Sequence, residues 1–147
     1  MKMGSQITLY LRGKPCRVFI APFDVRLPEF DEEDNQVETV VQPDLSIICD
    51  PGKLDEKGCR GAPDWIIEVL SPSTASKDQI QKKQLYEQRG VREYWLVHPV
   101  DRVLTIYLLQ DGSFGMPDIR AMEGTTPSNT LQGLEIDWAE VLEDIDG

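Results

Sequence analysis

The 147-residue sequence contains no long apolar run. A membrane-spanning helix needs about 20 apolar residues in a row, and the amino-terminal MKMGSQITLYLRGK also lacks the continuous apolar segment of a signal peptide. We therefore expect no membrane contact. The length and the 40% hydrophobic content suit a single domain over residues 1–147, which is large enough to bury a core without disulfides or a structural metal.

Cysteine and histidine are scarce as well. The three cysteines, Cys16, Cys49 and Cys59, are odd in number, far apart and without CxxC spacing. This pattern argues against a disulfide framework or a zinc site and favours a reducing cytoplasm. Cys16 and Cys49 adjoin apolar strands, so we interpret them as core residues. His98 is the only histidine, which excludes any catalytic arrangement that needs two.

Positive charge is in short supply, with 15 Lys and Arg against 26 Asp and Glu and a net charge of −11. Because proteins bind nucleic acids mainly through Lys and Arg contacts to phosphates, this balance argues against strong DNA binding. Residues 29–38 and 135–146 each hold six acids and no base, so the rest of the chain is close to neutral. One short segment holds a modest basic patch: Lys77, Lys82, Lys83, Arg89 and Arg92.

The stretch PDWIIEVLSPST, residues 63–74, is the strongest structural signal. It is short, apolar and bounded by prolines, which predicts a central strand that is buried on both faces. Side-chain alternation places Glu68 between Ile66 and Leu70, where an unpaired carboxylate would cost several kcal/mol. A metal ion, a lysine or a proton must offset that cost. A purely structural pair with an Arg or Lys explains the residue equally well.

Patterns elsewhere predict a mixed α/β fold. Residues rich in β-branched and aromatic side chains favour strands over 17–27, 39–49, 64–71, 92–98 and 102–109, the first two paired as a hairpin. The order strand, helix, strand over residues 64–98 predicts a crossover that makes its two strands parallel. Residues 4–13 fit a short helix and a strand equally well.

A capping box, Ser76 followed by Gln79, and a stop at Gly90 delimit a predicted helix over 77–89. Asp78, Lys82 and Tyr86 share one side of this helix. An exposed i,i+4 ion pair is the ordinary explanation for such a pattern, but the helix directly follows the strand that carries Glu68. We therefore favour a role beside Glu68.

In this chain, Pro43-Asp44 precedes a central strand with Glu68, and a lysine-bearing helix follows. This order of motifs resembles the PD-(D/E)XK nuclease superfamily. More closely, PFDVRL, VQPDLSIICDP, GAPDWIIEVLSPST and GVREYWLVHP are similar to the Uma family of restriction-endonuclease-like proteins. The resemblance runs from about Val18 to Trp138. It implies a restriction-endonuclease-like mixed β-sheet core with flanking helices. It also implies hydrolysis of DNA phosphodiester bonds that depends on Mg²⁺ or Mn²⁺.

The resemblance implies roles for individual residues. Asp44 and Glu68 match the two acidic metal ligands of the superfamily, and the Val69 backbone carbonyl is a further ligand. The usual lysine position holds Leu70, so the lysine is expected on the following helix. Lys82 fits that role best and Lys83 is the fallback. Four side chains are candidates for supporting these groups: Asp78, Tyr86, Ser71 and Ser73.

Two functions remain open at this point. The first is a Mg²⁺-dependent endonuclease that binds DNA weakly and without specificity; the second is a catalytically inactive relative that serves as a binding or assembly module. Family members usually have an amino-terminal helix with a further acid near the metal, whereas no residue before Arg17 is acidic, so this region is interpreted as shortened. Because cutting a duplex takes two sites, we expect a homodimer; the apolar strands EYWLV and VLTIYLL are either its interface or simply core.

Overall fold

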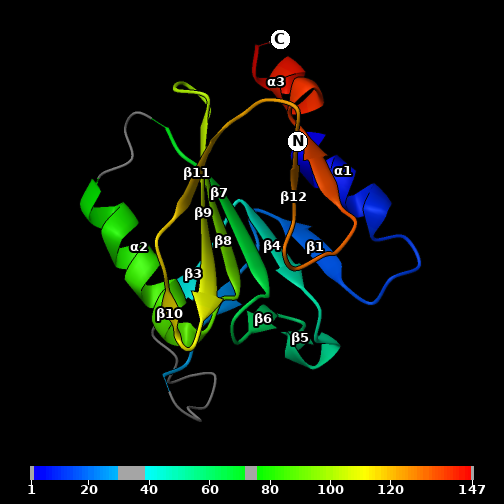
Figure 1. Ribbon diagram of the computed structural model, residues 1–147. Helices are drawn as coiled ribbons and strands as arrows, with labels where there is room; N and C mark the ends of the chain where they lie inside the picture. Colours follow the sequence, from blue (N-terminus) through cyan, green and yellow to red (C-terminus); the bar gives the residue numbers. More distant parts are fainter. Residues whose placement is uncertain (1, 30–38, 72–75, 147) are drawn as a thin grey trace.

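The computed structural model describes residues 2–29, 39–71 and 76–146, and its centre is a mixed β-sheet (Figure 1). Seven strands form this sheet in the order β1-β4-β7-β8-β9, with β10 and β11 both pairing with β9. Its strands are β1 (Arg17–Ile20), β4 (Leu45–Ile48), β7 (Trp65–Val69), β8 (Glu93–His98), β9 (Val103–Gln110), β10 (Ser113–Phe114) and β11 (Asp118–Ala121). The predicted mixed α/β class is confirmed.

Two small sheets and three α-helices complete the described part of the chain. One small sheet has the order β3 (Val40–Val41), β2 (Val25–Arg26), β6 (Gly58–Arg60), β5 (Leu54–Asp55), and the other pairs β12 (Thr125–Pro127) with β13 (Glu135–Asp137). The helices are α1 (Lys2–Tyr10), α2 (Ser76–Arg89) and α3 (Trp138–Asp146), and a 3-10 turn spans Pro51–Lys53. Among the described residues, no helix is long and apolar enough to cross a membrane.

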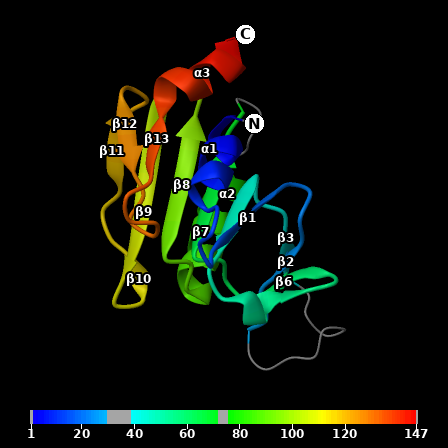
Figure 2. The same ribbon diagram turned by 90° about the vertical axis from the view of Figure 1, so that its right-hand side faces the viewer.

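β7 lies inside the sheet, as its sequence predicts. It pairs antiparallel with β4 and parallel with β8, and α2 makes the crossover between the two parallel strands. Its side chains alternate between two hydrophobic clusters: Trp65 and Ile67 pack with α1 and α3, whereas Ile66 packs with Tyr86 of α2. Figure 2 shows α1 and α2 on opposite faces of the sheet. Burial on both faces explains the continuous apolar run of this strand.

The two predicted strands 17–27 and 39–49 are each broken in the middle. Their outer parts, β1 and β4, pair in the main sheet, whereas β2 and β3 pair in a small sheet. The breaks fall around Pro22 and Pro43, which lack the N–H group that a ladder needs. The predicted pairing of the two segments therefore holds, but in two separate pieces. One consequence is that Asp44 lies directly at the beginning of β4.

The amino-terminal segment is a helix rather than a strand. The buried residues of α1 are Met3, Gly4 and Ile7, at the spacing of one helical face. A Cβ atom at Gly4 would meet the Ile20 and Leu45 side chains at 3.1 and 3.3 Å, so the absence of a side chain lets the helix approach β1 and β4 closely. Since α1 contains no acid, it brings no carboxylate to the sheet.

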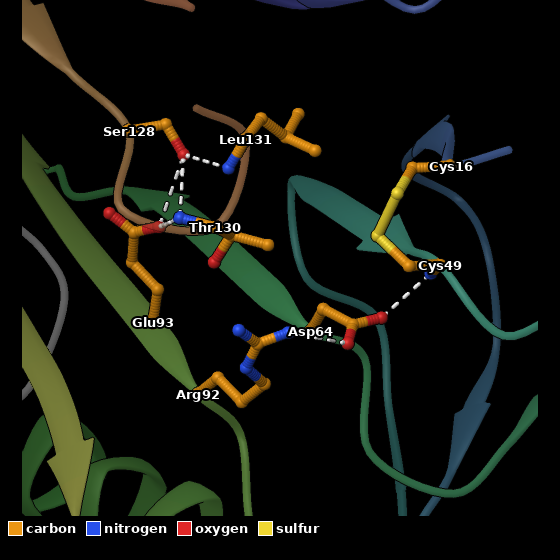
Figure 3. Close-up of a disulfide and its surroundings, with 8 residues drawn as sticks. All are labelled: Cys16, Cys49, Asp64, Arg92, Glu93, Ser128, Thr130 and Leu131. Carbon is orange, nitrogen blue, oxygen red and sulfur yellow. Dashed lines mark hydrogen bonds and ion pairs between the residues drawn. A yellow bond between two sulfur atoms is a disulfide. The ribbon is translucent and has the colours of Figure 1, made fainter. Parts of the chain in front are cut away.

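A disulfide joins Cys16 and Cys49, which corrects the expectation that both are reduced core residues (Figure 3). The β1–β4 register pairs Arg17 with Ile48, so the next outward pair is Cys16 with Cys49. The sequence did not predict this disulfide, because the two cysteines are 33 residues apart and the total number of cysteines is odd. The strand register brings the two residues together. Cys59 is buried and free. The cysteines consequently give no support for a reducing compartment.

Glu93, at the beginning of β8, is a buried acid that the sequence did not single out. It is 1% exposed. Its carboxylate accepts a hydrogen bond from Trp95 Nε1 at 2.8 Å. It also accepts hydrogen bonds from the Thr130 backbone N–H at 2.9 Å and from Ser128 Oγ (Figure 3). These neutral donors satisfy the carboxylate without a cation. Glu93 therefore fixes the loop over 128–131 against the sheet.

The strands EYWLV and VLTIYLL, expected to supply a dimer interface, lie within the sheet. Residues 93–97 of β8 are buried, and β8 is paired on both sides, with β7 and β9. β9 likewise has partners on both edges, because β10 and β11 cover the edge that faces away from β8. β8 is core, and both strands are paired along most of both edges, so a second chain would meet them mainly through the half-buried face of β9. The expected homodimer stays a prediction.

Candidate active site

Asp44 and Glu68 face each other across two neighbouring strands. The β4–β7 register pairs Leu45 with Ile67, and continuing it by one residue places Asp44 opposite Glu68. Directly opposed residues have Cβ atoms about 5 Å apart and point to the same face of the sheet. Asp44 Oδ2 accepts a hydrogen bond of 2.7 Å from the Val69 backbone N–H, which fixes this carboxylate at the end of β7.

Glu68 is 6% exposed, and its carboxylate contacts three side chains. Tyr86 OH donates to Oε1 at 3.1 Å and Tyr94 OH donates to Oε2 at 3.0 Å. Lys82 Nζ lies 3.5 Å from Oε1. The two buried hydroxyls and one ammonium supply the compensation that the sequence requires for an acid at this position.

Tyr86 and Tyr94 are held in their neutral, donating form. Burial raises the pKa of both phenols well above its ordinary value, and the nearby Glu68 carboxylate raises each pKa further. A negative phenolate would lose hydration and would also repel Glu68. Both hydroxyls therefore stay protonated and bonded to Glu68 at neutral pH.

Lys82 reaches the site from α2. Its ammonium group lies between Glu68 at 3.5 Å and Asp78 Oδ2 at 3.7 Å, and its side chain is 35% exposed. Asp78 and Lys82 are one helical turn apart, so the exposed carboxylate of Asp78 can hold the lysine in place over the strand end. The structure thus brings Asp44, Glu68 and Lys82 together, although they come from three separate elements.

These three residues line one small pocket of about 110 Å³. Val69 and Asp78 line the same pocket, as does the exposed Gln42 side chain. The carboxylate and amide oxygens that line the pocket are hard ligands of the kind that Mg²⁺ prefers. Mg²⁺ needs only one or two protein carboxylates, because water molecules complete its coordination. Within the described residues, no three Asp, Glu, His or Cys side chains cluster tightly enough to hold a metal without such help.

Glu68 and Asp44 retain the capacity to bind a cation. An ionised carboxylate has about four acceptor positions, and the contacts of Glu68 use three of them, two on Oε1 and one on Oε2. Asp44 uses Oδ2 for the Val69 N–H. The donor set therefore fits a divalent cation with water in its remaining positions.

Other predicted residues are placed differently. The Lys83 ammonium lies over the Tyr107 ring, 5.0 Å from its centroid, and does not line the pocket. Ser71 is exposed and lines a neighbouring pocket, and Ser73 lies outside the described residues. Tyr86, by contrast, contacts Glu68 directly.

The predicted basic patch is divided between the two ends of the sheet. Arg92 pairs with Asp64 at the beginning of β7, at 3.5 Å, whereas Glu68 lies at the other end of that strand. α2 has 14 residues and is therefore roughly 20 Å long, so Lys77 and Arg89 lie at its opposite ends. Arg89 and Arg92 are thus remote from the pocket. Of the five bases, Lys82 lines the pocket, and Lys77 directly precedes Asp78, which also lines it.

Sequence reasoning missed Tyr94. In the parallel β7–β8 pair, Tyr94 lies beside Ile66, so alternation directs its side chain to the face that carries Glu68. Parallel pairing was predicted, but the register was not. With the register known, Leu96 lies beside Glu68, and Tyr94, two residues earlier, points to the same face. A tyrosine at that spacing in the neighbouring strand is the signal that could have identified it.

The sequence profile of the Uma2 family, described as "Putative restriction endonuclease", matches residues 2–139. A solved structure titled as a putative nuclease belonging to DUF820 from Anabaena variabilis is similar, with a TM-score of 0.72 and 17% identity. The alignment covers 97% of this chain and 76% of that one, and at this identity it establishes the fold. No curated protein matches the chain. Since the profile covers most of its length, the chain belongs to the Uma2 family.

Proposed function

We propose that the chain is a Mg²⁺-dependent endonuclease that hydrolyses DNA phosphodiester bonds. The observation that carries the proposal is the meeting of Asp44, Glu68 and Lys82 in one pocket. Two carboxylates and a lysine at the end of a central strand are the groups that metal-assisted phosphodiester hydrolysis needs. Membership of a family described as restriction endonucleases supports the same activity.

The side chains have distinct tasks in this proposal. Asp44 and Glu68, with the Val69 carbonyl, would hold Mg²⁺ or Mn²⁺, which lowers the pKa of bound water and neutralises charge on the phosphate. Lys82 would donate hydrogen bonds to the attacking water or to the charged oxygens of the phosphorane. Tyr86 and Tyr94 orient Glu68 through its two oxygens. Asp78 positions Lys82.

Affinity for DNA should be low. The chain carries a net charge of −11, and Arg89 and Arg92 lie far from the pocket. Few phosphate contacts are then available, chiefly from Lys77 and Lys82. We expect weak, non-specific binding that weakens further as salt screens these contacts.

The activity is tested by plasmid nicking in Mg²⁺, in Mn²⁺ and in chelator, with wild type and Glu68→Gln. The amide keeps the shape of the side chain but removes the ligand charge, so nicking should cease in the variant while its circular dichroism spectrum is unchanged. Nicking in chelator, or equal rates in the two proteins, would show that the pocket is not the source of activity.

Calorimetry separates the endonuclease from the inactive alternative. Titration of wild type with Mg²⁺ and Mn²⁺ should show binding that Glu68→Ala abolishes, because the change removes a ligand. A chain that binds neither ion and nicks no DNA would be the binding or assembly module instead.

The homodimer also remains a proposal, since cleavage of both strands takes two sites. β8 is buried within the sheet, so an interface through these strands would use the half-buried side chains of β9. Sedimentation at micromolar concentration that detects only monomer would remove this part of the proposal.

A further inference from the structure

Two larger pockets adjoin the candidate active site, one on each side. A pocket of about 320 Å³ shares Gln42 with the central one and is lined by Phe23. A pocket of about 280 Å³ shares Leu70 and Gln79 with it and is lined by His98. We call this row the edge trough, defined by Phe23, Gln42, Asp44, Glu68, Leu70 and His98.

Strand directions explain why the three pockets of the edge trough lie in a row. β7 and β8 are parallel and end at Val69 and His98, so the ends of both strands lie at one edge of the sheet. β1 runs antiparallel to β4, and the Ala21 N–H that follows it donates to the Asp44 carbonyl at 3.0 Å. Phe23 and His98 consequently lie on either side of the acidic pair. The described residues thus form an extended site with Glu68 near its middle.

The charges along the edge trough are unfavourable for phosphates outside its centre. Seven carboxylates line the three pockets, against only two lysine ammonium groups. In the Phe23 pocket, Asp24 accepts a bond of 2.6 Å from Gln42 Nε2, and Asp55 is paired with the buried Arg26. A DNA duplex would bring two phosphate backbones close to these groups and would be repelled. The central pocket can accept a phosphate only because a divalent cation offsets its acids.

The outer pockets suit bases better than phosphates. Phe23 stacks on Phe19 with ring centroids 4.3 Å apart and planes within 9°, and Arg17 lies 5.2 Å from the Phe19 centroid. Phe19 covers one face of the Phe23 ring, and Phe23 itself lines the pocket. Aromatic side chains bind unpaired bases by stacking, and carboxylates accept hydrogen bonds from base amino groups. A base in a duplex presents neither its face nor its pairing edge.

We propose that the edge trough binds an unpaired DNA strand, with a phosphate over Asp44 and Glu68 and a neighbouring base against Phe23. This inference rests on the proposed function and names its substrate as single-stranded or locally unpaired DNA. A single strand needs only one site per cut, so this reaction does not depend on the homodimer that cleavage of both strands of a duplex requires. Base contacts replace the phosphate contacts that a strongly acidic protein lacks.

The first test uses nucleotides that contain no phosphodiester bond. Mg²⁺-loaded wild type is titrated with deoxynucleoside monophosphates, with deoxyribose 5-phosphate and with inorganic phosphate. Stacking should make the nucleotides bind about ten-fold more tightly than the sugar phosphate. Phe23→Leu should remove this difference and leave phosphate binding unchanged. Phe19→Leu is the matched control, because Phe19 belongs to the same aromatic pair but does not line the pocket.

His98 provides an independent readout, because the chain has no other histidine and its ring protons give one assignable set of NMR signals. These signals should move when a short single strand is added in Mg²⁺, and less with a duplex of the same sequence. Gel analysis of the same samples measures how much of each DNA has been cut. Equal affinity for duplex and single strand, or nucleotide binding that Phe23→Leu leaves intact, would overturn the inference. Base-dependent binding without cleavage of either the single strand or plasmid DNA would support the edge trough and reject the endonuclease, so the two failures are distinguishable.

Discussion

Tyr94 OH donates a hydrogen bond of 3.0 Å to Glu68 Oε2 from the neighbouring parallel strand. The other Glu68 oxygen is held by Tyr86 from α2. The candidate metal ligand is therefore fixed by two elements, the sheet and the covering helix. Because the phenols are neutral, they orient Glu68 without cancelling the negative charge that a cation needs.

Tyr94→Phe should destabilise the chain by about 1–3 kcal/mol, because it leaves a buried carboxylate oxygen without a donor. Tyr107→Phe is the matched control: its ring is stacked near Tyr94, with centroids 6.2 Å apart, and its hydroxyl is not bonded to Glu68. Urea unfolding at pH 7 measures both variants. Equal losses would mean that the Glu68 contact contributes nothing specific.

The free energy of unfolding should fall above about pH 10 because of Tyr94. Burial and Glu68 raise the folded-state pKa of Tyr94 above its ordinary value of about 10, so in alkali the unfolded chain loses this proton first. Its stabilising contribution is complete below pH 10 and declines by about 1.4 kcal/mol per pH unit above it. Tyr94→Phe should show a correspondingly shallower decline in urea unfolding between pH 10 and 11.

Cys59 also lowers the stability of the chain in alkali, but this contribution is the same in wild type and in Tyr94→Phe. Burial raises its thiol pKa to about 11 from the ordinary 9.0, so stability also declines between these values. Wild type and Tyr94→Phe both retain Cys59, and the difference between them isolates the tyrosine. Identical pH profiles for the two proteins would contradict the assignment.

The sequence was informative where local chemistry dominates. The run around Glu68 predicts a buried central strand because it is apolar on both faces, and the capping box at Ser76 predicts α2 to within one residue. Glu68 stood out as a site residue for the same reason, since an acid in such a strand needs a partner.

What the sequence could not predict depends on strand register. The Cys16–Cys49 disulfide, the Asp44–Glu68 opposition and the Tyr94 contact all arise because particular residues are neighbours across strands. Register follows from how a whole sheet assembles, whereas alternation reveals only the face on which a side chain lies. The burial of Glu93 similarly depends on a loop more than 30 residues away, at Ser128.

Removal of the disulfide should lower stability by about 4 kcal/mol, because it frees a loop of 33 residues in the unfolded chain. The double change Cys16→Ser and Cys49→Ser is compared with Cys59→Ser by urea unfolding, with and without a reductant. Reductant should weaken wild type and Cys59→Ser but leave the double variant unchanged. Thiol titration of unreduced, denatured wild type should find one free thiol; three would show that the bond is absent.

Lys82→Ala should reduce cleavage about 100-fold while metal binding survives, because the lysine donates to the water or the phosphorane and is not a ligand. Lys83→Ala is the matched control, since Lys83 is the next residue on α2 and contacts the Tyr107 ring instead of the pocket. Nicking rates in Mg²⁺ give the first quantity, and calorimetric titration with Mg²⁺ gives the second. Loss of an ammonium 3.5 Å from Glu68 should even strengthen Mg²⁺ binding, because a competing positive charge is gone. Weaker metal binding in Lys82→Ala, or equal slowing in both variants, would assign Lys82 to structure rather than to the reaction.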